Sequence, residues 1–211
     1  MRWWPASAVV AFVLIEARSF VDTPNLSEDL QASPSAESVK YIDERVPDLF
    51  IGYGLTVLGL AFVAFFVAGL VQAVRSKAPD SFAAQIISIG GGATVAATFV
   101  GYSFNLILAG AAEENRAPTT VVSIYTIADS LGYIGWVLLG LVTAGVAIAS
   151  LHDHVFPRWL GWVSAIATAL FALLTFAPFL SWAPALLWLL VAGVGLLVHE
   201  RRGGTPAAVA A

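Results

Sequence analysis

Residues 119–162 read TTVVSIYTIADSLGYIGWVLLGLVTAGVAIASLHDHVFPRWLGW. This stretch decides the fold, because a long apolar run carries one acid, Asp129, and ends at the polar turn HDH, residues 152–154, before a Pro-Arg-Trp restart. An unbroken helix from 119 to 151 would be about 50 Å long, against roughly 30 Å of hydrocarbon in a bilayer. We therefore expect a break or exit between Tyr125 and Gly132, then a membrane span, then a turn into the next span.

The composition is typical of a membrane protein. Of the 211 residues, 59% are hydrophobic and only 11% are charged, and the mean hydropathy is +0.84. A soluble domain has a smaller apolar share and a larger charged one. The chain has no cysteine, which excludes disulfides and thiolate chemistry. The net charge of -4 comes without a basic cluster, so nucleic acid is not an expected partner.

Apolar runs elsewhere in the chain extend this pattern to six spans. We predict an all-α, polytopic integral membrane helical bundle, with residues 1–202 as one domain. An acidic segment, residues 22–48, separates the first two spans, and the Gly/Ala tail, 203–211, is expected to be disordered. A cleaved signal peptide is the alternative for the first run, but Glu16-Ala17-Arg18 is a poor cleavage site and favours a retained helix. The predicted transmembrane helices cover about residues 3–20, 49–74, 82–112, 131–151, 157–178 and 183–199.

The basic residues predict the orientation of these spans. Cytoplasmic loops of membrane proteins carry an excess of Lys and Arg. The side that holds both termini has six basic residues, and the other side has four basic residues together with ten of the fourteen acids. We therefore expect cytoplasmic N and C termini and an extracytoplasmic acidic segment. The first set comprises Arg2, Arg75, Lys77, Arg158, Arg201 and Arg202, and the second Arg18, Lys40, Arg45 and Arg116.

Two further patterns concern packing. In the acidic segment, Ser33-Pro34 can start a helix in which Val39, Ile42 and Val46 form an apolar stripe, which would lie on the membrane surface; a solvated loop is the alternative. In the third span, small residues recur at a spacing of four: Gly92 with Ala96, and Ala93 with Ala97 and Gly101. This spacing predicts a face that a second helix can approach closely.

Asp129 is the first candidate for a functional residue. An ionisable side chain within a span is costly and usually faces a bundle interior or a wet cavity. The predicted topology puts other polar residues at a comparable depth, and their convergence would form an outward-facing, ligand-binding cavity with Arg18 as a counter-ion. The alternative is that Asp129 only caps the fourth span. The candidate cavity residues are Asp129, Asn105, Tyr102, Tyr53, Glu16 and Arg18.

His152 and His154 are weak candidates for metal ligands. Residues two apart diverge on a helix, and the sequence fixes no third or fourth ligand near them. A solvated turn at a helix C-terminus explains these residues without a metal. No serine lies in a G-x-S-x-G elbow, and all three histidines are expected on the cytoplasmic side. The sequence therefore indicates no metal, no cofactor and no catalytic residue.

The LHDH segment at residues 151–154 and the FPRWLGW segment at residues 156–162 resemble a hairpin in a group of uncharacterised bacterial multi-pass membrane proteins. That group is known only as a domain of unknown function, and Tyr41-Ile42-Asp43 is a second, shorter point of likeness. The resemblance covers mainly the C-terminal half. It implies a compact bundle of about six helices in a bacterial cytoplasmic membrane, and it transfers no catalytic residue.

These observations favour a non-enzymatic membrane module. Its expected partners are membrane lipids together with a small or lipid-like hydrophobic ligand or another membrane protein. A small transporter or transporter subunit is the alternative, and it requires a cavity that connects to both sides. A membrane-embedded enzyme is a third reading, and it requires Glu16, Asp129 and Asn105 to converge on one substrate atom.

Overall fold

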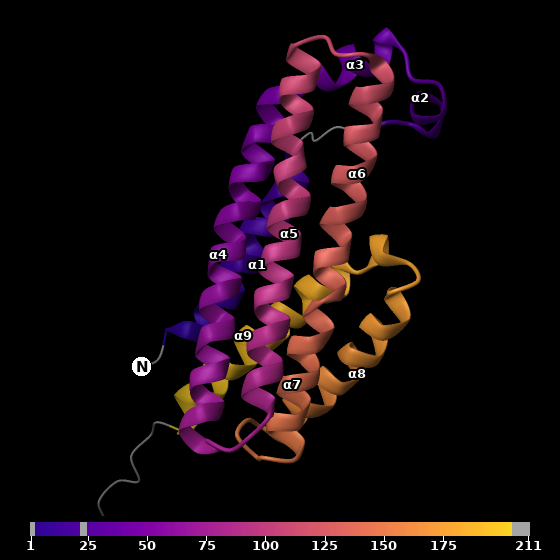
Figure 1. Cartoon of the computed structure of the whole chain (residues 1–211). Helices are drawn as coiled ribbons and strands as arrows, with labels where there is room; N and C mark the ends of the chain where they lie inside the picture. Colours follow the sequence, from indigo (N-terminus) through magenta and orange to yellow (C-terminus); the bar gives the residue numbers. More distant parts are fainter. Residues whose placement is uncertain (1–2, 22–24, 204–211) are drawn as a thin grey trace, which may run out of the picture.

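The computed structural model describes residues 3–21 and 25–203, and all regular structure within them is helical (Figure 1). Residues 22–24 of the acidic segment and residues 204–211 of the tail lie outside the described part, so the expected disorder of the tail concerns residues that are not described. The helices are α1 (Trp4–Ala17), η1 (Arg18–Phe20), α2 (Glu28–Ala32), α3 (Ala36–Asp43), α4 (Val46–Lys77), α5 (Ala83–Glu113), α6 (Pro118–Val137), α7 (Leu139–Leu151), α8 (Arg158–Leu174), η2 (Pro178–Leu180) and α9 (Trp182–Gly203).

Four helical segments are long and apolar enough to cross a membrane: Val46–Lys77, Ala83–Glu113, Pro118–Leu151 and Pro178–Glu200. Large apolar side chains on their outer surfaces are exposed, among them Phe65 on α4 and Ile89 on α5. A helix that is apolar on the outside as well as toward its neighbours is suited to lipid. The described part of this membrane protein is therefore all-helical. α4 and α9 contain the spans predicted at 49–74 and 183–199, and α5 begins one residue after the start of the span predicted at 82–112.

Between Tyr125 and Gly132 we expected either a break of the helix or its exit from the membrane. The break is wrong, and the exit stays a prediction. The helix continues through this region, and its single irregular residue is Leu138, between α6 and α7. Packing against α5 explains the continuity, because Gly101 and Gly132 bring the two backbones together: a Cβ added at Gly101 would lie 2.6 Å from the Gly132 nitrogen. Glycine contacts of this kind hold α6 to α5 across the segment in which we expected the helix to end.

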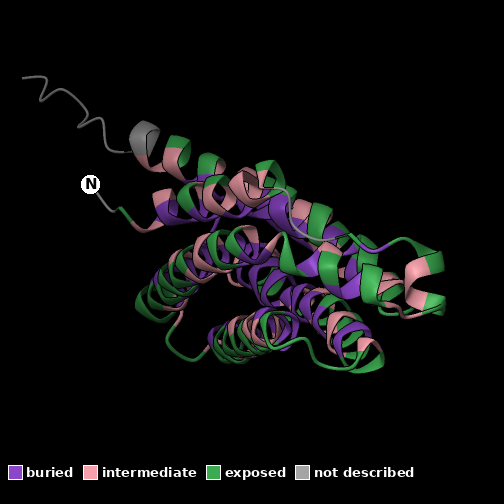
Figure 2. Ribbon diagram, turned by 90° about the horizontal axis from the view of Figure 1, so that it is seen from above, coloured by how far each residue is buried: buried purple, intermediate pink, exposed green. Residues whose placement is uncertain are grey.

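The described residues contain two hydrophobic cores that lie at different heights along the long helices. The larger core is built from α1, the end of α6, α4, α5, α7, α8 and α9, and it includes Phe66, Leu139 and Trp188. The smaller core joins α3 to one end of α4, α5 and α6 and includes Ile42 and Leu108. Figure 2 shows buried residues facing between the helices and exposed residues on the outer surface. Among the described helices, only α4, α5 and α6–α7 run from one level to the other (Figure 1).

The acidic segment forms two short helices that pack against protein. α3 begins at Ala36, after Ser35, so the expected helix start at Ser33-Pro34 is wrong. The Ser35 backbone N–H donates to the Ser38 Oγ at 3.3 Å, which satisfies one end of the helix. Val39 and Ile42 are buried in the smaller core. Val39 and Ile42 of the predicted stripe therefore lie on one helix, but they cover the ends of α5 and α6, and Val46, the third residue, belongs to α4.

The predicted small-residue face of α5 is correct at Gly101 only. Gly92 and Ala96 are exposed, and nothing lies within 4 Å of a Cβ added at Gly92. The face that contacts α6 and α7 includes Gly90, Thr98 and Gly101. Apart from Gly101, the observed contact residues Gly90 and Thr98 are not among the predicted ones. Thr98 shows that the contact face contains threonine as well as glycine.

Two predicted spans correspond to shorter helices. α1 has 14 residues and continues through η1 to Phe20, which covers most of the predicted 3–20. α8 has 17 residues and ends at Leu174, before the end predicted at residue 178, and η2 follows after a turn. Both helices nevertheless contribute to the larger core.

Candidate functional site

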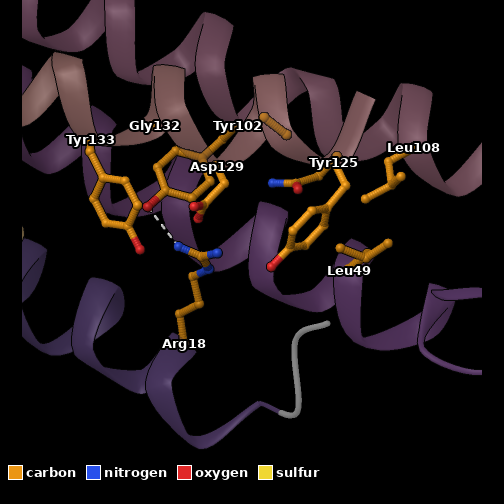
Figure 3. Close-up of a pocket in the computed structure, with 10 residues that line it drawn as sticks. Arg18, Leu49, Tyr102, Leu108, Tyr125, Asp129, Gly132 and Tyr133 are labelled. Carbon is orange, nitrogen blue, oxygen red and sulfur yellow. Dashed lines mark hydrogen bonds between the residues drawn. The ribbon is translucent and has the colours of Figure 1, made fainter. Parts of the chain in front are cut away.

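A small polar cavity lies where α1 ends beside α5 and α6 (Figure 3). Its volume is about 50 Å³, enough for one or two water-sized groups. Charged and phenolic side chains dominate its wall. The lining residues are Arg18, Leu49, Tyr102, Asn105, Leu108, Tyr125, Ala128, Asp129, Gly132 and Tyr133.

Arg18 enters the cavity from η1, directly after α1. Its Nη1 donates to the Tyr102 hydroxyl at 2.6 Å, and its guanidinium carbon lies 4.4 Å from the centre of the Tyr102 ring. Tyr102 is buried, while Arg18 is partly buried. A guanidinium has five N–H donors, so contact with one hydroxyl leaves most of its donors for other acceptors. Tyr102 therefore fixes the position of the cation without using up its hydrogen-bonding capacity.

Asp129 comes from α6, with one tyrosine a turn before it and another a turn after it. The spacing of four in Tyr125, Asp129 and Tyr133 puts all three side chains on one face of the helix. Asp129 is exposed at the rim, and its carboxylate lies near the Arg18 guanidinium and the Tyr133 ring (Figure 3). Within the described part of the chain, no ion pair joins Arg18 to Asp129. The cavity wall thus holds both signs of charge without direct neutralisation.

A second, larger cavity adjoins the first across a shared wall of Arg18, Tyr102 and Tyr133. Its volume is about 230 Å³, and the rest of its wall is mostly apolar or aromatic, with residues from α1, α6 and α9. Trp136 at this wall is only 1% exposed. The two cavities together offer a polar end and an apolar end. The further lining residues are Ile15, Ser19, Trp136, Trp182 and Leu186.

The structure gathers four of the six candidate residues, namely Arg18, Tyr102, Asn105 and Asp129. Glu16 lines neither cavity, and its Oε2 accepts a hydrogen bond from the Ser19 Oγ at 3.1 Å. Tyr53 also lines neither cavity; its ring lies 6.5 Å from that of Phe99. The inclusion of Glu16 and Tyr53 in the cavity is therefore wrong. A comparable depth in the membrane does not fix the direction in which a side chain points.

Asp129 does not cap a helix. It lies inside α6, eleven residues after Pro118, and the residue that precedes α7 is Leu138. The capping alternative depended on a break that the helix does not have. The Asp129 carboxylate therefore lines the cavity and does not accept hydrogen bonds from the free backbone N–H groups at a helix start.

Tyr125 and Tyr133 are the cavity residues that the sequence analysis missed. Their spacing from Asp129 was the signal that could have identified them, because a turn of helix separates each from the acid. Tyr125 also connects the cavity to the acidic segment: its hydroxyl accepts a hydrogen bond from the Leu26 backbone N–H at 3.3 Å. The cavity is thereby coupled to the smaller core.

The HDH turn, residues 152–154, connects the loop after α7 to the loop between α4 and α5 at the other end of the bundle. The Ser81 hydroxyl donates to Asp153 Oδ2, and His152 Nδ1 bonds to Asp153 Oδ1 at 2.7 Å. These hydrogen bonds, the one with His152 first, hold the pKa of the Asp153 carboxyl below its usual value. No group of three metal-ligating side chains exists among the described residues. Ser81 bonds to an aspartate and has no histidine base, so the cluster also lacks the geometry of an activated nucleophile.

Comparison with protein-family models, curated proteins and solved structures gives no match to the chain. The resemblance noted for residues 151–162 therefore remains an expectation, and the argument for function depends on the site itself.

Proposed function

We propose that the chain crosses the membrane six times, with both termini in the cytoplasm. The end of α1, the η2 turn after α8 and the start of α9 lie at the level of Tyr133, where the Ser181 Oγ donates to the Tyr133 carbonyl at 3.0 Å. From Tyr133 to Leu151 the helix rises about 27 Å, close to the thickness of the hydrocarbon layer. Against this thickness, the 17 residues of α8 rise about 26 Å, and the 14 residues of α1 rise about 21 Å and reach about 27 Å together with η1.

Exposed aromatic residues support these two membrane boundaries. Trp182 and Phe179 are exposed beside the level of Tyr133, and Trp3, Trp159 and Trp162 are exposed at the opposite end. Aromatic rings are enriched where helices pass through the headgroup region. Arg75, Lys77 and Arg158 lie at the end that we assign to the cytoplasm, while the acids of α2 and α3 lie at the other. The part of α4–α6 beyond Tyr133 then projects from the membrane as a cap with α2 and α3.

We further propose that the protein is a binding module for a lipid-like ligand. The observation that carries this proposal is the junction of a polar, doubly charged cavity with a larger one whose wall is mostly apolar beyond the shared residues. The proposed topology puts this junction at the outer membrane boundary. An amphipathic molecule presents the same sequence of surfaces, a polar head followed by an apolar chain. A lipid of the outer leaflet would meet this junction with its headgroup at the correct depth.

The interior of the bundle argues against transport as the primary activity. Below the second cavity, the described residues Trp136, Leu139 and Phe171 are no more than 1% exposed, and they fill the space between the helices. A membrane-embedded acid–base enzyme has less support, because Glu16 lies outside the cavity that holds Asp129 and Asn105. Binding without conversion or transfer is therefore the function that we favour.

A substitution at Gly132 tests this proposal by filling the polar cavity. A Cβ at this position would lie 3.5 Å from the Tyr102 ring, an ordinary contact, so Gly132→Ala should fold and serves as the control. Gly132→Leu should occupy the cavity of about 50 Å³. We expect native mass spectrometry of protein from lipid nanodiscs to show a retained lipid-sized adduct on the natural protein and on Gly132→Ala, but not on Gly132→Leu. Equal adducts on all three proteins, or none on any, would overturn the proposal.

A further inference from the structure

We infer that the ligand carries a zwitterionic headgroup, with a primary ammonium bound at Asp129 and a phosphate bound at Arg18. This inference rests on the proposed binding function and names the class of ligand. Its basis is that one continuous surface holds an acid from α6 and a guanidinium that follows α1, and that the guanidinium is positioned by its hydrogen bond to Tyr102.

The first cavity suits an ammonium group. Asp129 supplies an anionic acceptor, and Asn105 supplies a side-chain carbonyl. Tyr125 and Tyr133 also line this space (Figure 3), and aromatic faces attract cations. The volume of about 50 Å³ admits an ammonium but is restrictive for a bulkier cation. An ammonium that bears hydrogens can also donate to Asp129, which a quaternary ammonium cannot do.

The wall shared by the two cavities suits a phosphate. Arg18 lines both cavities, and its guanidinium keeps donors free beyond the one given to Tyr102. Guanidinium groups bind phosphate oxygens through paired, charge-assisted hydrogen bonds. The Tyr133 side chain, which also lines the second cavity, adds a hydroxyl group at this position. A phosphate here would lie next to an ammonium in the first cavity.

The second cavity suits the apolar part of the same molecule. Beyond Arg18, Ser19 and the two tyrosines, its wall consists of Ile15, Trp136, Trp182 and Leu186. Trp182 is partly open to the outside, with 39% of its surface exposed. A glycerol backbone and the start of an acyl chain could leave the cavity past Trp182 toward the lipid. The ammonium, the phosphate and the apolar part of an aminophospholipid would thus meet the first cavity, the shared wall and the second cavity in that order.

The charges also predict which lipids bind poorly. A purely anionic headgroup can reach Arg18 but leaves Asp129 facing a negative ligand. A choline headgroup carries a positive charge, but its trimethylated nitrogen has no hydrogen to donate and is too bulky for the first cavity. The wall therefore favours phosphoethanolamine over phosphoglycerol and phosphocholine.

The test uses the full-length protein in detergent, titrated with phosphatidylethanolamine, phosphatidylglycerol and phosphatidylcholine of identical acyl chains and followed by native mass spectrometry. We expect the natural protein to bind the ethanolamine lipid at least about tenfold more tightly than the others, a difference of ~1.4 kcal/mol. Asp129→Asn should abolish this preference, and Arg18→Gln should weaken binding of all three phospholipids. Glu16→Gln changes a nearby acid that lines neither cavity and should leave the preference intact.

A separate arm adds soluble phosphoethanolamine as a competitor. Displacement of the lipid shows that the headgroup alone is recognised, and a preference without displacement shows that the acyl part is needed; both results support the inference. Equal binding of the three lipids, or an unchanged preference in Asp129→Asn, would overturn the inference of a zwitterionic headgroup. If Gly132→Leu still blocks binding in that case, the proposed lipid-binding function stands. Absence of any lipid on the natural protein would remove both.

Discussion

Replacing Gly101 by alanine should separate α5 from α6, and the structure sets the size of the effect. A Cβ at this position would lie 2.6 Å from the Gly132 nitrogen and 2.7 Å from the Leu131 carbonyl carbon. Ordinary contacts of a Cβ begin at 3.4 Å, so the helices would have to move apart by 0.8 Å, the difference between 3.4 and 2.6 Å. The obstacle is backbone, which no rotamer change can remove. Overpacking of this kind costs about 1–3 kcal/mol.

Gly92→Ala is the matched control for this prediction. Gly92 lies on the same helix, and nothing stands within 4 Å of an added Cβ. Both substitutions gain the same helix propensity, about 0.5–1 kcal/mol, so the difference between them isolates the contact. At about 2–4 °C per kcal/mol for a chain of this size, Gly101→Ala should melt several degrees below Gly92→Ala when tryptophan fluorescence is followed in detergent. Equal melting temperatures would refute the close approach of α5 to α6.

Three other predictions concern separate parts of the molecule. Ile42→Ala in α3, a fully buried position, should destabilise the smaller core by about 2–5 kcal/mol and increase proteolysis of the acidic segment while α8 and α9 stay protected. Trp188→Phe removes the buried hydrogen bond of 3.1 Å to the Ser164 Oγ and should cost about 1 kcal/mol, an effect that should disappear in a Ser164→Ala background. The pKa of Asp153 is lowered in the folded protein. Its carboxylate therefore stabilises the fold above the unfolded-state pKa, and this contribution is lost as the pH falls through the folded-state pKa. Melting curves of Asp153→Asn, measured at pH values around and below 4, should lack this part of the acid dependence of the natural protein.

The long membrane helices could be predicted from sequence because their signals are local. The apolar runs of α4 and α5 end in charged residues, Arg75 and Lys77 in one case and Glu113 in the other. Lipid requires such a run to be helical, since backbone groups cannot remain unpaired in hydrocarbon. Helix boundaries therefore followed from composition alone, within a few residues.

The region around Asp129 could not be predicted in the same way. An acid inside an apolar run indicates either a helix end or a partner elsewhere, and the sequence does not distinguish these alternatives. The distinction depends on Gly101 of α5, which packs on Gly132, and on Arg18, which arrives from a segment 111 residues earlier in the chain. The same limitation explains why Tyr53 and Glu16 were included at the right depth but do not line the cavity.

The position of the cavity follows from a mismatch in helix length. α4 and α5 have 32 and 31 residues, about 47 Å each, whereas α1 stops at Ala17 and α9 starts at Trp182, both beside Tyr133. Where shorter helices end against longer ones, their terminal backbone groups need partners. The residues next to these ends, Arg18 just after α1 and Ser181 just before α9, turn their side chains toward α5 and α6. Polar groups therefore collect at this single level, between an apolar core below and a capped segment above. A change in helix length that moved the end of α1 by one turn would carry Arg18 away from Tyr102 and separate the two charges on which the zwitterion depends.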